Sequence, residues 1–204
     1  MTSIMKPALY IKSSLVTTQG HALVIPPAFF ETSPTAIGDR EGEDGLEADE
    51  TKLQLLPYIT LMNDAGEVFC YYRGKAGEES RLHGALSIGL GGHVDTAVAP
   101  LDKLEHHLKR EAGRELAEEA GIVLADPVNQ LTFTHLIYDA TNPVGRVHLG
   151  IRCVYRMTSA DRVDPEKGTI EKGFFRHPSK FTPEEVVRME NWSQVCLNLL
   201  CRGL

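Results

Sequence analysis

The amino-acid sequence predicts an α/β protein with a mixed β-sheet. Two segments, 57–75 and 131–158, alternate apolar with polar residues, are rich in β-branched side chains, and carry turn signals near their centres, a pattern typical of β-hairpins. A polar stretch with regularly placed leucines, from about residue 101 to 120, separates them, and a second helix signal lies near the C-terminus. Strands, helix, strands and helix in this order indicate helices packed on a sheet.

Turn residues place the strands more closely. The first hairpin turns at Asn63-Asp64-Ala65-Gly66, and the second turns around "TNPVG", residues 141–145; both are sequences that favour tight reversals. Between them, "GALSIGLGGHVD", residues 84–95, predicts a short strand that ends in glycines.

Capping residues place the helices. Gly121 suits the C-cap of the first helix, because glycine adopts the left-handed conformation without strain. At the C-terminal helix, Thr182 is a good N-cap, Pro183 suits the first helical position and Glu185 completes a capping box.

Composition limits the function. The formal net charge of -7 argues against a broad nucleic-acid-binding or anionic-membrane surface. No apolar run is long enough to cross a bilayer. The N-terminal residues lack the apolar core of a signal peptide, and the four cysteines are widely spaced. We therefore expect a cytoplasmic protein with reduced thiols.

The chain divides by composition into an N-terminal arm, residues 1–56, and a main domain, residues 57–204. Within the arm, about 32–52 are rich in glycine and acidic residues and poor in large apolar ones. We interpret this part as a mobile, solvated acidic loop. Changes to Glu47 or Glu50 are accordingly expected to have little effect on turnover or on the stability of the fold.

The segment "GRELAEEAGI", residues 113–122, gathers acidic side chains on one face of the predicted helix. At 100° per residue, Glu118 lies about 60° to one side of Glu115 and Glu119 about 40° to the other, and Glu111 falls within the same arc. Like charges at this spacing repel on an isolated helix. A solvated glutamate face is the ordinary interpretation, and a site for a hard divalent cation such as Mg²⁺ is the functional one.

The same residues carry a family resemblance. "RELAEEAGI" resembles the second half of the Nudix box, G-x5-E-x7-R-E-U-x-E-E-x-G-U, in which U is a bulky aliphatic residue; Leu116 and Ile122 fill both U positions. "GLGGHVD" resembles the glycine turn that opens the box. The resemblance covers about residues 57–200 and implies the Nudix fold, an α/β/α sandwich with a mixed sheet.

One departure from the pattern concerns spacing. Counting back from Arg114 puts Pro100 where the box has its first glycine and His106 where it has its first glutamate, whereas Gly91 and Gly92 lie about eight residues earlier. We therefore expect an insertion, with a kink or a separate short helix before the catalytic part. The first glutamate then has four candidate replacements: Asp95, Asp102, Glu105 and Glu111.

The resemblance also implies a chemistry. Nudix proteins typically use Mg²⁺ or Mn²⁺ to hydrolyse a phosphoanhydride in a nucleoside diphosphate linked to another group, and they are often homodimers. By this resemblance Glu115, Glu118 and Glu119 are metal ligands, with one of them serving as base, and Arg114 orients a neighbouring carboxylate. A backbone carbonyl at Gly91 or Gly92 is a further candidate ligand.

Three residues outside the helix are weaker candidates. Glu171 has the place of the acid that many Nudix enzymes bring from a late loop, and solvent exposure explains it equally well. His93 follows the glycines and is a candidate phosphate contact or a plain turn histidine. Tyr138 has a position where the family's dinucleoside-polyphosphate branch often carries tyrosine, and core packing is the alternative.

Two other functions compete with hydrolysis. A nucleotide-sensing module on the same scaffold would bind without cutting, although such modules often lose box glutamates and this chain keeps three. An isoprenoid diphosphate isomerase would need an active-site cysteine, for which Cys70 is the candidate.

Overall fold

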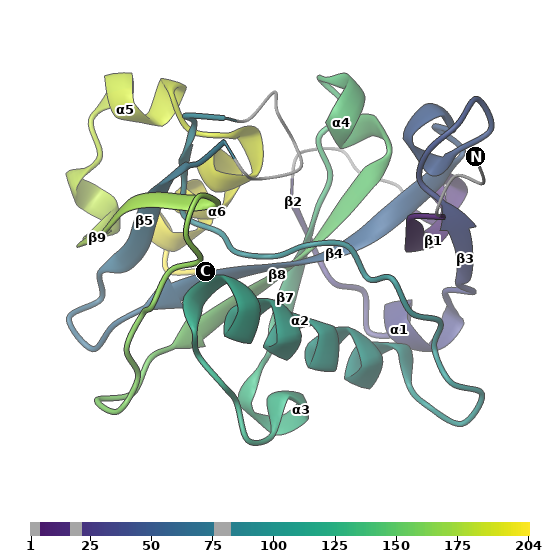
Figure 1. Ribbon diagram of the computed structural model, residues 1–204, viewed down its shortest axis with the longest axis horizontal. Coiled ribbons are helices and arrows are strands. Elements are labelled where there is room, and N and C mark those ends of the chain that lie inside the picture. The colour runs from purple at the N-terminus through teal and green to yellow at the C-terminus, as the bar shows by residue number, and fades with distance from the viewer. Residues whose placement is uncertain (1–4, 17–21, 76–82) are drawn as a thin grey trace.

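The computed structural model describes residues 5–16, 22–75 and 83–204. Within these residues, nine strands form one mixed sheet (Figure 1). The strands are β1 Pro7–Lys12, β2 Ala22–Val24, β3 Ala36–Asp39, β4 Lys52–Met62, β5 Val68–Arg73, β6 Leu86–Ser87, β7 Phe133–Ile137, β8 His148–Arg156 and β9 Ile170–Arg176.

The sheet follows the order β2-β7-β8-β4-β1-β3, and β5 extends it from the end of β4 and pairs with β6 and β9. The central pair, β4 and β8, is parallel, with Gln54 opposite His148 at one end and Met62 opposite Arg156 at the other. The other strand pairs are antiparallel. Both predicted hairpins are confirmed, as β4–β5 and β7–β8.

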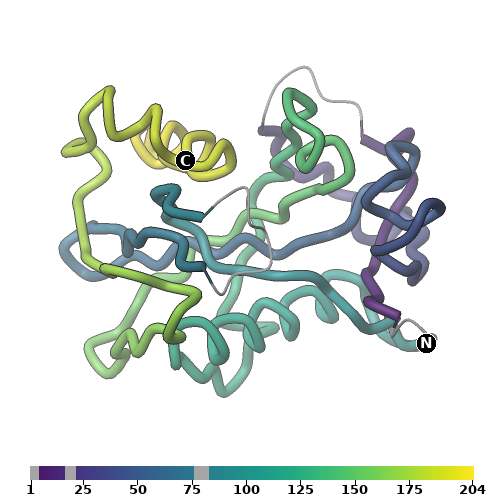
Figure 2. The backbone as a smooth tube through the Cα atoms, turned by 45° about the horizontal axis from the view of Figure 1, so that its top comes forward, coloured from purple at the N-terminus to yellow at the C-terminus, as the bar shows by residue number. Residues whose placement is uncertain are grey.

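Two long helices, α2 and α6, cover opposite faces of the sheet, as the turned view in Figure 2 shows. Leu108 and Leu116 of α2 (Leu104–Ala120) pack in a core with Leu55 and Ile59 of β4. Cys196 of α6 (Asn191–Cys201) packs with Tyr58 from the other face of that strand. The α/β/α sandwich is therefore confirmed. The helices are α1 Phe29–Thr32, α2 Leu104–Ala120, α3 Pro127–Gln130, α4 Pro143–Arg146, α5 Pro183–Val187 and α6 Asn191–Cys201, with 3-10 turns η1 Ser13–Leu15, η2 Leu46–Ala48 and η4 Pro178–Lys180.

No helix among the described residues is both long enough and apolar enough to span a bilayer.

Helix α2 is continuous, so the expected kink or separate short helix was wrong. Leu104 and Leu108 are both buried in the same core as Leu116, because residues four apart form one ridge along the helix. Between Gly92 and Leu104 the chain forms neither helix nor strand. Leu101, in that segment, is fully exposed.

The N-terminal arm is part of the sheet. β1 pairs with both β3 and β4, and β4 crosses the position of the expected boundary between residues 56 and 57. Where an acidic loop was expected over 32–52, the structure places β3 and η2, with Leu46 only 2% exposed. The few apolar residues of this segment, Ile37 and Leu46, are enough to anchor it.

The C-terminal helix begins as predicted, with the capping box of Thr182 and Glu185 formed. It is interrupted, however, so that α5 and α6 are separate. At the break the backbone of Leu86 accepts a hydrogen bond from Glu190 and donates one to the carbonyl of Arg188. The chain therefore leaves the helix to pair with the edge of β6.

Candidate active site

The glycine turn after β6 lies against the second half of α2. The Gly91 amide donates a 2.9 Å hydrogen bond to Glu119 Oε2. A Cβ at Gly91 would lie 2.0 Å from the carbonyl oxygen of Pro57, and one at Gly92 would lie 2.7 Å from Glu115 Oε1. The Pro57 carbonyl leaves no room for a side chain at Gly91, and a side chain at Gly92 would displace the Glu115 carboxylate, so glycine at these positions lets the turn lie close to β4 and α2.

Arg114 organises the acidic face of α2. Its Nε lies 2.9 Å from Glu111 Oε2, Nη1 lies 2.7 Å from Glu118 Oε2, and Nη2 lies 2.6 Å from Glu115 Oε1. Nη2 also donates to the His93 carbonyl at 3.2 Å. One guanidinium thus fixes three carboxylates and the turn that faces them.

The predicted ligands differ in their surroundings. The Glu118 side chain is 56% exposed, whereas that of Glu115 is 9% exposed. Burial, with repulsion from Glu118, raises the pKa of Glu115 to about 7 even though Arg114 opposes this change. Burial and the charge of Glu115 raise the pKa of Glu119 to about 8. Ionising these two carboxyl groups therefore costs free energy, and a bound divalent cation would offset that cost.

Of the four candidates for the first box glutamate, Glu111 contacts Arg114. Its other carboxylate oxygen accepts a 3.2 Å hydrogen bond from Thr96. Asp102 and Glu105 pair instead with Arg110 and Lys109, and Asp95 is exposed. Glu111 is the candidate that the fold connects to the acidic face.

Comparisons with known proteins identify the fold. No family model matches the chain. Protein YmaB of Bacillus subtilis is 34% identical over 155 residues, which are 76% of this chain and 74% of YmaB. The crystal structure of Tm1382, described as a candidate Nudix hydrolase, superposes with a TM-score of 0.73 over 98% of this chain and 100% of that one, at 22% identity. The chain belongs to the same family as YmaB and has the Nudix fold. A Nudix hydrolase from Alicyclobacillus acidocaldarius has the same fold, with a TM-score of 0.53 and 14% identity over 72% of this chain and 90% of that one.

Glu171, the sequence candidate for a late acid, does not contact α2 among the described residues. Glu171 lies exposed on β9 opposite Tyr72, and no hydrogen bond or ion pair joins it to α2 in the described structure. Glu166 instead donates its backbone N–H to the Glu119 carbonyl at 3.0 Å, and its charge contributes to the raised pKa of Glu119. No motif around Glu166 marks it in the sequence.

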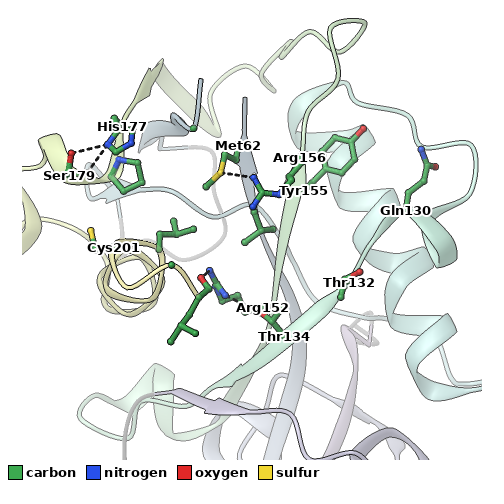
Figure 3. Close-up of a pocket in the computed structure, with 16 residues that line it drawn as sticks. Met62, Gln130, Thr132, Thr134, Arg152, Tyr155, Arg156, His177, Ser179 and Cys201 are labelled. Atoms are coloured by element: carbon green, nitrogen blue, oxygen red, sulfur yellow. Dashed lines mark hydrogen bonds between the residues drawn. The ribbon is translucent and has the colours of Figure 1, made fainter. Parts of the chain in front are cut away.

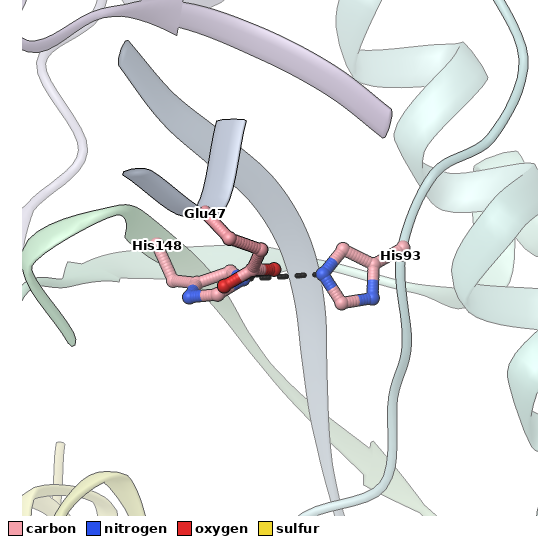
Figure 4. Close-up of side chains that lie close together, drawn as sticks. All are labelled: Glu47, His93 and His148. Atoms are coloured by element: carbon pink, nitrogen blue, oxygen red, sulfur yellow. Dashed lines mark hydrogen bonds and ion pairs between the residues drawn. The ribbon is translucent and has the colours of Figure 1, made fainter. Parts of the chain in front are cut away.

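His93 points away from the α2 carboxylates. Its Nε2 lies 3.1 Å from Nε2 of His148, at the start of β8, and Glu47 of η2 lies beside them (Figure 4). Sequence reasoning missed Glu47 and His148 as site residues. No local spacing connects positions 47, 93 and 148, so no sequence signal was available for this group.

The two remaining candidates, Tyr138 and Cys70, pack in or against the hydrophobic core. Tyr138 is half-buried and packs against the core that α2 covers. Cys70 is fully buried, and burial raises the pKa of its thiol to about 12, which does not favour an isomerase that needs a reactive cysteine.

A pocket of about 720 Å³ is lined by none of the Nudix box residues (Figure 3). Arg152 and Arg156 of β8 and His177 contribute to its wall. The Arg152 guanidinium is already bound, by Thr134 at 3.0 Å and by the Leu204 carbonyl at 2.8 Å. We therefore locate the candidate active site by its carboxylates and not by this hollow.

Proposed function

We propose that this Nudix-fold protein is a hydrolase that cuts a phosphoanhydride in a nucleoside diphosphate linked to another group, with Mg²⁺ or Mn²⁺ as cofactor. The observation that carries the proposal is the placement of Glu115 and Glu119. Both are held against the glycine turn, and both have raised pKa values because like charges are buried together. Oxygen donors in such a set fit a hard divalent cation.

Each residue of the acidic face has a distinct task in this proposal. Glu115, Glu118 and Glu119 would hold the cation, with the carbonyl of Gly92 as a further candidate donor. The Gly91 N–H fixes the orientation of Glu119. Arg114 is a positioning residue, because it holds Glu115 and Glu118 at fixed directions and links them to Glu111.

A bound Mg²⁺ or Mn²⁺ would neutralise phosphate charge and lower the pKa of an attacking water. Proton removal from that water would fall to a carboxylate among Glu115, Glu118 and Glu119. Glu166, beside Glu119, takes the role first expected of Glu171.

Product analysis tests the proposal. The intact protein is incubated with nucleoside triphosphates, nucleoside diphosphate sugars and dinucleoside polyphosphates, in Mg²⁺, in Mn²⁺ or in EDTA, in ¹⁸O-labelled water. We expect hydrolysis of at least one substrate class that requires metal, with the label in a phosphate product. Nucleotide binding by calorimetry without turnover would favour the sensor module instead. The absence of both binding and turnover would contradict the proposal.

We also propose that the protein is a cytoplasmic homodimer. The composition supports the location and the family supports the assembly. Light scattering of the intact chain would measure twice the 22.5 kDa monomer mass if the proposal is correct.

A further inference from the structure

Glu47, His93 and His148 form a second cluster, here called the histidine–glutamate cluster. His93 Nε2 lies 3.1 Å from His148 Nε2, which lies 3.5 Å from Glu47 Oε1. One ligand atom from each residue lies within 4.8 Å of the others (Figure 4). The residues come from η2, the glycine turn and the start of β8, so three distant segments meet here.

The orientation of His148 is fixed by the backbone. Its Nδ1 lies 2.7 Å from the Val144 carbonyl, which can only accept a hydrogen bond, so Nδ1 carries a proton. In the neutral ring, Nε2 then directs a lone pair into the cluster. Metal-binding histidines have this arrangement, with the outer ring N–H on a carbonyl and the inner nitrogen free to bind.

The spacing of the donor atoms suits a small tetrahedral ion. Zinc ligands lie about 2.0–2.1 Å from the metal, and tetrahedral angles then separate neighbouring ligand atoms by about 3.3–3.4 Å. The two distances around His148, 3.1 and 3.5 Å, lie on either side of this value.

Polar groups around the cluster are only partly paired. In the neutral form of His148, Nε2 can accept a hydrogen bond from His93 Nε2 but cannot donate one to the Glu47 carboxylate 3.5 Å away. Gln54, fully buried, donates its Nε2 to Glu47 Oε1 at 3.2 Å, but its own Oε1 has no hydrogen-bond partner among the described residues. Arg40 Nε lies 3.7 Å from the same Glu47 oxygen and balances part of the charge. A cation bound by the three side chains would be a shared partner for the carboxylate oxygen and ring nitrogens that now face one another.

We propose that Glu47, His93 and His148 bind a transition-metal ion of the zinc class, at a site separate from the carboxylates of α2. Two imidazoles and one carboxylate favour zinc over Mg²⁺ or Ca²⁺, which prefer oxygen ligands. Three protein ligands leave a position for water or another ligand. The Glu47 side chain is 34% exposed, so that position is reachable from solvent.

Such an ion would tie the N-terminal arm to the active-site turn. Glu47 belongs to the arm, while His93 lies two residues after Gly91, whose N–H holds Glu119. The ion is therefore expected to stabilise the fold mainly by joining η2 to the turn and β8. The proposed metal site does not depend on the hydrolase activity proposed above.

Metal titration of the full chain tests the site. Co²⁺ is added to metal-free protein in excess Mg²⁺, which competes for the α2 carboxylates, and visible d–d absorption is recorded before displacement by Zn²⁺. We expect one Co²⁺ per chain with the spectrum of a four- or five-coordinate site. The Glu118→Gln/Glu119→Gln variant should bind this ion unchanged, so the result is separable from the fate of the α2 site.

Matched variants decide which residues bind the ion. His148→Gln, His93→Gln and Glu47→Gln should each weaken Zn²⁺ binding by more than the roughly 10- to 100-fold that loss of a ligand's outer partner causes. His177→Gln and Glu50→Gln are the controls, because the His177 ring bonds to Ser179 side-chain and backbone atoms and Glu50 pairs with Arg146. Zn²⁺ should also raise the melting temperature of the wild type and of both controls.

Failure has a clear form. Absence of Co²⁺ and Zn²⁺ binding in excess Mg²⁺, or equal binding by wild type and a correctly folded His93→Gln or Glu47→Gln variant, would overturn the proposal. A hydrogen-bonded cluster in which His148 is protonated would then account for the geometry.

Discussion

Two polar clusters lie on either side of the same short turn, residues 91–93, and the pKa values of their buried groups move in opposite directions. On α2, Glu115 and Glu119 are like charges, so burial and repulsion raise their pKa values to about 7 and 8. In the histidine–glutamate cluster, burial alone would raise the pKa of Glu47, but hydrogen bonds and charge from His148 outweigh it and lower the pKa to about 2.

His93 completes this contrast. Burial, with the positive charges of Arg40 and His148, lowers its pKa to about 3, so it stays neutral. Near neutral pH the α2 cluster therefore keeps its buried carboxyl groups partly protonated, whereas Glu47 stays ionised beside the neutral ring of His93. Whether the pKa of a buried carboxyl group rises or falls is decided by its neighbours and not by burial itself.

The largest expected effect separates the two clusters by function. Glu119→Gln should lower turnover of the identified substrate by on the order of 100-fold or more, because it removes charge stabilisation needed mainly in the transition state. His148→Gln should change turnover only a few-fold, since His148 does not contact the α2 carboxylates and would act only by loosening the attachment of the N-terminal arm to the glycine turn. Steady-state kinetics in saturating Mg²⁺ measures both.

The control for this comparison is Glu50→Gln, which should retain wild-type turnover because Glu50 is an exposed partner of Arg146. Near-normal turnover by Glu119→Gln would show that the α2 face is merely acidic and not catalytic.

A smaller effect tests the extent of the α2 cluster. Glu166→Gln should lower activity about tenfold, within the range for groups that support metal ligands, and raise the Mg²⁺ concentration needed for half-maximal rate. Glu171→Gln is the matched change on β9 and should have little effect. Activity measured against Mg²⁺ concentration checks the pair; a larger loss in Glu171→Gln would restore the original assignment of the late acid.

The smallest expected effect is on stability, and its pH dependence has opposite signs in the two clusters. Glu115 and Glu119 have folded pKa values above the usual 4.5, so the native state binds more protons than the unfolded chain between about pH 4.5 and 8. Metal-free protein should therefore lose stability as pH rises through this window, by at most about 1.4 kcal/mol per pH unit for each carboxyl group. Glu115→Gln/Glu119→Gln should flatten this slope.

Glu47 and His93 act in the other direction. Their folded pKa values lie below the usual 4.5 and 6.5, so the unfolded chain binds more protons, and their contribution is lost as pH falls from about 6.5 towards 2 or 3. Glu47→Gln/His93→Gln should flatten the acid side only. Urea unfolding in EDTA across this pH range measures both slopes, and identical slopes in both double variants would contradict the assigned pKa values.

The continuity of α2 shows where sequence reasoning met its limit. Leu104 and Glu115 are eleven residues apart, as are Leu108 and Glu119, so each pair lies within about 20° on the helix. Leucines and glutamates on one arc suggested a kink. In the fold, the first half of that arc packs on the core and the second half meets the glycine turn, so one straight helix serves both environments.

The sequence by itself determined the hairpins, the caps and the acidic face of α2, because turn chemistry and the helical repeat act over a few residues. It did not determine that Glu111 contacts Arg114, that Glu166 and not Glu171 lies beside Glu119, or that the acidic segment 32–52 carries a strand. The histidine–glutamate cluster is the extreme case. Its members lie 46 and 55 positions apart, and the parallel pairing of β4 with β8 sets His148 opposite Gln54, which donates a hydrogen bond to Glu47. Strand pairing over such separations depends on the packing of the whole sheet, and only the tertiary structure decides it.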